Sequence, residues 1–189
     1  MHLQLQRLEV GPWPMNCYLL RCPRTQVVAV VDPGADADAI LAAVNEAPVL
    51  CILLTHGHAD HVGAVEAICQ ATDAPVGIHP ADAAVFDLEA DFPLIDGMEV
   101  EIGKGRVVLS HAPGHTAGSI CLRLGHTTTP DALAQSLVSL GRTVFTWPDQ
   151  TELFPGHGPS TTVGSERSYF ERFIQADHPL DLCGDVSWR

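Results

Sequence analysis

The most informative part of this 189-residue chain reads Thr55-His56-Gly57-His58-Ala59-Asp60-His61. It directly follows the apolar run Val49–Leu54, which predicts a buried strand, and it directly precedes a helical pattern. Loops at strand ends are held by a rigid scaffold and stay open to solvent, so functional groups collect there. Two imidazoles in a His-x-His arrangement reach one metal ion, whereas Asp60 and His61 turn the other way, towards a second ion. The stretch therefore predicts a site for one or two zinc ions, with iron or manganese as alternatives.

Two later histidines have a similar setting. Pro113-Gly114-His115-Thr116 follows a predicted strand that ends at His111, and Pro155-Gly156-His157-Gly158-Pro159 follows one that ends at Phe154. Proline and glycine fix such turns and allow the backbone to come close to a neighbour. Either motif alone is a weak signal, but beside the first cluster both histidines are candidate metal ligands.

Taken together, these motifs resemble those of the metallo-β-lactamase superfamily, and within it the glyoxalase II-like hydrolases (hydroxyacylglutathione hydrolases and their small bacterial relatives). The likeness extends from Gly11-Pro12 through Val31-Asp32-Pro33-Gly34 to the helix after Thr162. It implies an α+β fold, an αββα sandwich of two mixed β-sheets flanked by helices. It also assigns Asp32 as a buried carboxylate that orients ligands. The metal ligands that the resemblance implies are His56, His58 and His115 for one ion, and Asp60, His61 and His157 for the other.

The chain departs from the family pattern at one place. Relatives carry a further strand that ends in Gly-Asp, and that aspartate bridges the two metals. Here Leu124 is followed by Gly125-His126-Thr127-Thr128-Thr129-Pro130, which is typical of the approach to the next helix. Either the chain has lost the segment, or the sequence as given omits a loop. A bridging carboxylate neutralises both cations, so we expect a first site of three neutral histidines and a weaker second site.

The resemblance implies a hydrolase in which metal-activated water attacks a thioester or ester, with Asp60 as the catalytic residue that orients the water and accepts its proton. Two alternatives stay open. One is a mononuclear iron enzyme of the persulfide dioxygenase type, and the other is a metal-binding member impaired by the lack of the bridging aspartate. A β-lactam substrate is less favoured, because nothing in the sequence indicates a periplasmic address.

Composition restricts the partners. Ten Lys and Arg residues against 23 Asp and Glu residues give a net charge of −13, which opposes binding to nucleic acid. No apolar run approaches the roughly 20 residues of a membrane helix, and no signal-peptide pattern opens the chain. The six cysteines form no Cys-x-x-Cys pair and read as small buried residues of a reducing compartment. We expect a cytoplasmic enzyme with a small-molecule substrate, no nucleic-acid partner and no membrane partner; the sequence does not indicate the oligomeric state.

The remaining patterns predict one domain over residues 1–189, in which strands alternate with helices. The segment Asp87–Asp96 is expected to be irregular, and one amphipathic helix is expected to carry Val62, Val65, Ile68 and Cys69. Further helices are predicted on the patterns Ala37-Ile40-Leu41-Val44, Leu133-Leu137-Leu140 and Phe170-Phe173-Ile174, with a short one from Pro80. The other predicted strands are Leu3–Val10, Met15–Arg21, Gln26–Val31, Pro75–His79, Met98–Ile102, Arg106–His111, Ser119–Leu124 and Glu152–Phe154.

Overall fold

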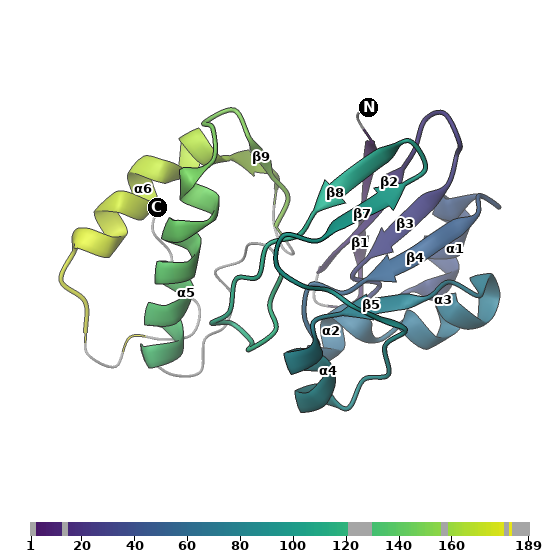
Figure 1. Ribbon diagram of the computed structural model, residues 1–189, viewed down its shortest axis with the longest axis horizontal. Helices are drawn as coiled ribbons and strands as arrows, with labels where there is room; N and C mark the ends of the chain where they lie inside the picture. Colours follow the sequence, from purple (N-terminus) through teal and green to yellow (C-terminus); the bar gives the residue numbers. More distant parts are fainter. Residues whose placement is uncertain (1–2, 13–14, 121–129, 156–158, 180–181, 183–189) are drawn as a thin grey trace.

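A computed structural model describes residues 3–12, 15–120, 130–155, 159–179 and 182. Its largest element is a six-stranded sheet in the order β1-β2-β3-β4-β5-β6 (Figure 1). The first three strands are antiparallel and the last four, from β3 on, are parallel. The carboxyl ends of β3, β4 and β5 therefore meet at one edge of the sheet. The six strands are β1 Gln4–Val10, β2 Met15–Arg21, β3 Val28–Val31, β4 Val49–Leu53, β5 Val76–Ile78 and β6 Phe92–Pro93.

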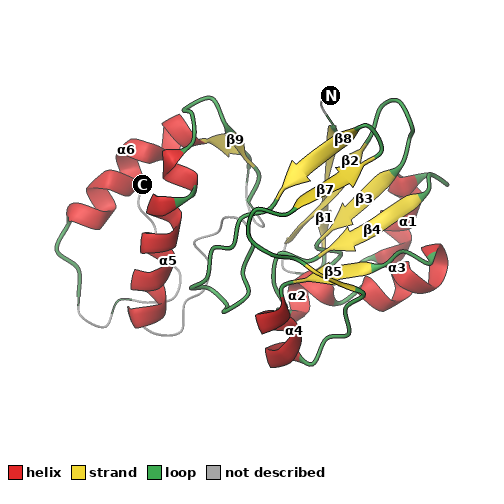
Figure 2. Cartoon of the chain, viewed as in Figure 1, coloured by secondary structure: helices red, strands yellow, loops and turns green. Residues whose placement is uncertain are grey.

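The two faces of this sheet are covered differently. Helices α1 (Ala37–Val44) and α3 (Val65–Thr72) pack on one face, where Val28 and Val30 of β3 point. The hairpin of β7 (Glu99–Ile102) and β8 (Gly105–Val108) covers the other face, where Ala29 points. Figure 2 shows the helices behind the sheet and the hairpin in front of it. Strand side chains alternate between faces, so one short apolar strand contributes to two core clusters.

The last third of the described chain forms a third cluster on the far side of the hairpin. It consists of α5 (Pro130–Arg142), the 3₁₀ turn Val144–Thr146, the pair β9 (Glu152–Leu153) and β10 (Thr161–Thr162), and α6 (Val163–Gln175). Its buried side chains are Leu140, Val144, Phe145, Val163 and Phe170.

Two sets of hydrogen bonds tie this part to the rest of the molecule. The Pro155 carbonyl accepts from Asn16 Nδ2 at 3.0 Å and from the Tyr18 hydroxyl at 2.5 Å. The Ser139 hydroxyl of α5 donates to the Pro113 carbonyl at 3.0 Å. Both contacts lie directly beside the segments that carry candidate metal ligands.

The α+β class and the mixed sheets flanked by helices agree with the sequence prediction, but several local predictions were wrong. The helix expected across Val62 and Cys69 is broken into α2 (Ala59–Val62) and α3, because the Ala64 amide donates to the Pro33 carbonyl at 2.9 Å instead of continuing one helix. The segment expected to be irregular contributes β6. Ile174, expected in the core, is half exposed.

Strand β10 was missed, because two threonines before a helix carry no alternation signal. The predicted strand Ser119–Leu124 is described only to Ile120, which pairs with His111 in one bridge. The rest of it lies outside the described residues. Within the described part of the chain, no helix combines the length and apolarity that crossing a membrane requires.

Candidate metal centre

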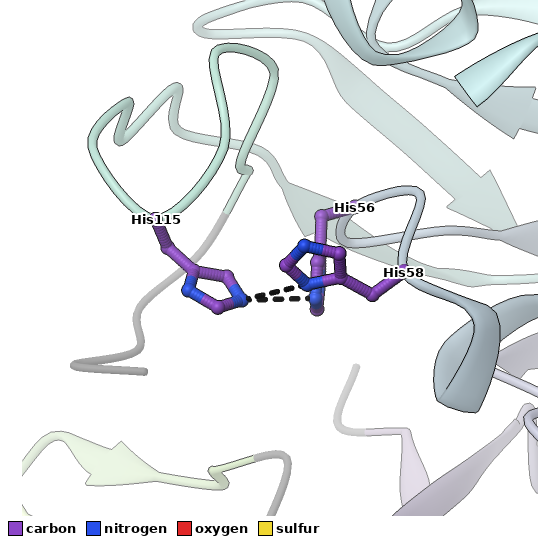
Figure 3. A group of neighbouring side chains, drawn as sticks. All are labelled: His56, His58 and His115. Atoms are coloured by element: carbon purple, nitrogen blue, oxygen red, sulfur yellow. Dashed lines mark hydrogen bonds between the residues drawn. The ribbon is translucent and has the colours of Figure 1, made fainter. Parts of the chain in front are cut away.

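Three histidines from two distant loops point at one another. His56 and His58 belong to the loop between β4 and α2, and His115 belongs to the loop that follows β8 (Figure 3). The centroids of the three rings lie 4.7 Å from one another, at interplanar angles between 72° and 87°. His115 Nε2 lies 3.2 Å from His56 Nε2 and 3.1 Å from His58 Nδ1. The loops thus bring three imidazole nitrogens to one point.

The geometry of these three nitrogens fits a cation. All three ligand atoms lie within 4.8 Å of one another. A tetrahedral zinc ion with Zn–N bonds of 2.0–2.1 Å separates its nitrogens by roughly 3.4 Å, close to the spacing observed. His115 Nε2 carries at most one hydrogen, so it donates to only one of the two nitrogens that face it. A divalent ion between the rings would use all three lone pairs at once, and the donor set suits zinc, iron or manganese.

A second group of predicted ligands lies beside the first. The His61 ring lies 4.0 Å from the His56 ring by centroids, and His61 Nε2 lies 3.8 Å from Asp60 Oδ2. His61 is almost fully buried, whereas the Asp60 side chain is 43% exposed. The third predicted ligand of this group, His157, lies outside the described residues.

Asp32 lies beneath the histidine loop, at the end of β3. Its Oδ2 lies 2.9 Å from His61 Nδ1 and accepts a hydrogen bond from the Thr55 hydroxyl at 2.7 Å. Its Oδ1 accepts from the Thr55 amide at 2.7 Å. His61 donates Nδ1–H to this carboxylate, which leaves its Nε2 on the side of Asp60. Asp32 thus orients a candidate ligand and does not join the histidine cluster, which is the role that the resemblance implies.

A second buried carboxylate, Asp82 in α4 (Pro80–Phe86), was missed by the sequence analysis. Its Oδ2 accepts from the Gly57 amide at 3.0 Å and from the Thr116 hydroxyl at 2.7 Å. Its Oδ1 accepts from the Gly118 amide at 2.6 Å. Asp82 therefore joins the His56–His58 loop to the His115 loop. In the sequence it reads only as an acidic residue in the first turn of a helix, where the dipole alone explains it.

Close backbone packing also fixes the loops. A Cβ on Gly34, just after β3, would overlap the Asp60 carbonyl oxygen. Gly114 has φ +145°, and a Cβ there would lie 2.6 Å from the Cα of Ser136 in α5. Both positions need glycine because backbone, which cannot swing aside, occupies the space.

The other histidines that the sequence singled out stand apart from the cluster. His79 caps α4, because its Nδ1 accepts from the Ala81 amide at 3.2 Å. The His111 ring stacks on His79 at 4.1 Å and 8°, and its Nε2 donates to the Ala117 carbonyl at 2.9 Å. Burial and the neighbouring His111 lower the pKa of His79 below its ordinary value. These two histidines support the loops around the site from outside.

A cavity of about 390 Å³ opens beside the histidine cluster. His56, His61 and His115 are among the residues that line it. Its walls come from the six-stranded sheet, from β8 and from the segment between α5 and β9. The cavity provides room for a small-molecule substrate next to the candidate metal ligands.

Comparison with known proteins agrees with a metal-binding fold of the metallo-beta-lactamase type. The profile described as the metallo-beta-lactamase superfamily matches residues 10–129. A hydroxyacylglutathione hydrolase from Anaeromyxobacter dehalogenans is 41% identical over 107 residues, which cover 56% of this chain and 41% of that protein. The crystal structure of TTHA1623 in a di-iron-bound form is 30% identical, with a TM-score of 0.68, and the match covers 86% of this chain and 96% of that one.

A relative aligned over most of its length carries residues that this chain lacks. A probable metallo-hydrolase of Bacillus subtilis, YqgX, is 28% identical over 202 aligned positions, covering 87% of this chain and 95% of the relative. The alignment is longer than the 189 residues of this chain. The relative therefore carries residues that have no counterpart in this chain.

Proposed function

The chain belongs to the metallo-β-lactamase superfamily, and from this premise we propose that it is a metal-dependent hydrolase of thioesters or esters. The observation that carries the proposal is the convergence of His56, His58 and His115 at the end of a cavity. The partial similarity to a hydroxyacylglutathione hydrolase supports a thioester as the substrate class.

A divalent ion bound by the three histidines would supply Lewis acidity, which makes hydroxide available near neutral pH and polarises a carbonyl group. To Asp60, whose exposed carboxylate lies 3.8 Å from His61 Nε2, we assign the role of orienting the attacking water and taking its proton. The oxygen of water adds to the carbonyl carbon and the carbon–sulfur bond breaks. The products are a carboxylic acid and a thiol, and the departing sulfur receives a proton. A thiolate with a pKa near 8.5 leaves without a strong general acid, which favours thioesters over amides.

The test is thiol release from a simple acyl thioester by protein reconstituted with zinc, iron or manganese. We expect hydrolysis that a chelator abolishes, and at least a roughly 100-fold loss in His58→Ala and His115→Ala. Asp60→Asn should lower kcat by about 100-fold and retain the first metal ion. Wild-type turnover that is indifferent to chelator and to both histidine substitutions would overturn the proposal.

A mononuclear iron oxygenase of the persulfide dioxygenase type is the second candidate. A similar protein crystallised with iron supports iron as the metal, although that structure holds two iron ions and this candidate needs one. It predicts oxygen uptake with a persulfide substrate and no thioester hydrolysis. An impaired metal-binding protein is the third candidate, favoured by the lack of a Gly-Asp segment between Leu124 and Pro130 in this sequence. It predicts metal binding without turnover of either substrate.

A further inference from the structure

The cavity beside the histidine cluster is apolar along most of its length. Away from the histidines, its described walls include Leu20, Val31 and Leu53 from the sheet and Ile120 beyond the hairpin. Tyr18 also lines it, but its hydroxyl donates to the Pro155 carbonyl. The Tyr18 ring therefore presents carbon to the cavity. Such a surface binds the hydrocarbon part of a ligand and not its polar part.

The lining of the same cavity includes large apolar side chains that are partly exposed. Leu5 of β1 is 38% exposed, Val108 of β8 is 56% exposed, and Phe154 after β9 is 41% exposed. All three line the cavity, although they come from three distant parts of the sequence. Single exposed apolar residues are ordinary, but a group of them around one opening marks a binding site.

The wall next to Phe154 is held in place. Trp147 lines the cavity, and its carbonyl accepts from Arg167 Nη2 of α6 at 2.8 Å. The same guanidinium donates to the Phe145 carbonyl and pairs with Asp149 at 2.9 Å. These bonds hold residues 145–149 in place, so the apolar wall that includes Trp147 is preorganised for binding.

Charge limits what this wall accepts. Among the described residues that line the cavity there is no lysine or arginine, whereas two carboxylates, of Asp32 and Glu152, line it. Asp32 lies at the histidine end and is engaged by His61 and Thr55. A substrate whose acyl chain ends in a carboxylate would meet the negative charge of Glu152.

We propose that this cavity binds an apolar, uncharged acyl group, with the scissile carbonyl at the histidine cluster and the chain along Leu5, Val108 and Phe154. The inference rests on the proposed hydrolase function and narrows its substrate class to thioesters or esters of hydrophobic acids.

The experiment compares acyl thioesters that share one uncharged thiol. With the metal-loaded protein, kcat/KM should rise by up to about fourfold per methylene from acetyl to octanoyl. For an octanoyl substrate whose chain ends in a carboxylate, kcat/KM should be at least about tenfold lower than for the octanoyl substrate itself. Glu152→Gln should reduce this difference in kcat/KM. A flat chain-length profile would overturn the inference while leaving the hydrolase function intact.

A matched pair of variants locates the chain. Val108→Ser should lower kcat/KM for the octanoyl substrate about fivefold and leave the acetyl substrate unchanged. Val138→Ser is the control, because Val138 is 51% exposed on α5 and does not line the cavity. Equal losses for both substrates, or equal effects of both variants, would contradict the proposed position of the chain.

A binding measurement separates this inference from the hydrolase function. A long-chain ketone, in which methylene replaces the sulfur, is titrated calorimetrically into the metal-free protein. We expect binding that Val108→Ser weakens about fivefold and Val138→Ser leaves unchanged. This result supports the acyl cavity even if no thioester is hydrolysed, whereas absence of binding overturns it. Tighter binding of a ligand whose chain ends in a carboxylate would also overturn the inference if Arg7→Met abolished that preference. Arg7 on β1 pairs with Tyr18, which lines the cavity, so such a result would indicate a cationic subsite.

Discussion

The carboxylate of Asp82 lies 3.0 Å from the backbone nitrogen of Gly57, which is the residue between two candidate metal ligands. The same carboxylate holds Thr116 and Gly118 on the loop that carries His115. One fully buried side chain in α4 therefore sets the distance between two loops that are far apart in the sequence. We expect it to act as a positioning residue for the metal centre.

Asp82→Asn should weaken zinc binding by about 10- to 100-fold, as loss of carboxylate support around a metal site does elsewhere. The asparagine amide cannot accept all three hydrogen bonds, so one buried N–H or hydroxyl loses its partner. Competition with a coloured chelator measures the affinity. Asp38→Asn, in the first turn of α1, is the matched control and should change nothing. Unchanged zinc affinity in Asp82→Asn would show that the loops hold their positions without it.

Metal content after dialysis tests the prediction that one site is strong and the other weak. We expect wild-type protein to retain about one equivalent of metal and His115→Ala to retain none. Zinc at 100 times its dissociation constant should stabilise the wild type by about 2.7 kcal/mol in urea denaturation, and should not stabilise His115→Ala. His178→Ala, three residues after the end of α6, serves as the control. Two tightly held equivalents in the wild type would contradict the prediction.

Gly34→Ala tests the backbone packing under the histidine loop. The new Cβ would collide with the Asp60 carbonyl, so we expect a loss of roughly 1–3 kcal/mol in the free energy of unfolding and a weaker second metal. Gly141→Ala is the control within α5, because its Cβ would meet the Phe170 ring at an ordinary 3.5 Å. That substitution should be neutral or stabilise the helix by up to about 1 kcal/mol. Equal effects of the two changes would refute the packing argument.

The pH dependence of stability tests His79, the N-cap of α4. His79 has a pKa lowered by burial and by the His111 ring, whereas Asp82 acts in the opposite direction. Above its ordinary pKa of 6.5, His79 is neutral in both the folded and unfolded chains and contributes no pH dependence. Below that pH the unfolded chain binds the proton first, so stability falls until the pH passes the folded pKa.

His79→Asn should remove this contribution, because asparagine also caps helices but does not titrate. The difference in unfolding free energy between wild type and variant, measured on metal-free protein, should be small at pH 7.5 and should shift in favour of the variant towards pH 5. A difference that stays constant across this range would show that His79 does not titrate differently on folding.

The sequence alone predicted the α+β class, most strand positions and the loop that carries His56 and His58. These features are local: apolar periodicity marks strands and helices, and ligand spacing within a few residues survives any packing of the chain. The prediction of His115 also depended on a local pattern, a Pro-Gly turn after a strand. His157 stays a prediction, since it lies outside the described residues.

Only the tertiary structure decided the rest. The role of Asp82 depends on contacts with residues 25, 34 and 36 positions away, and no local pattern encodes such pairings. The break between α2 and α3 depends on a hydrogen bond from Ala64 to Pro33. The apolar cavity joins Leu5, Val108 and Phe154, which share a surface because β1, β8 and β9 pack around one opening. Long-range packing places these side chains together, and its outcome is a property of the whole fold.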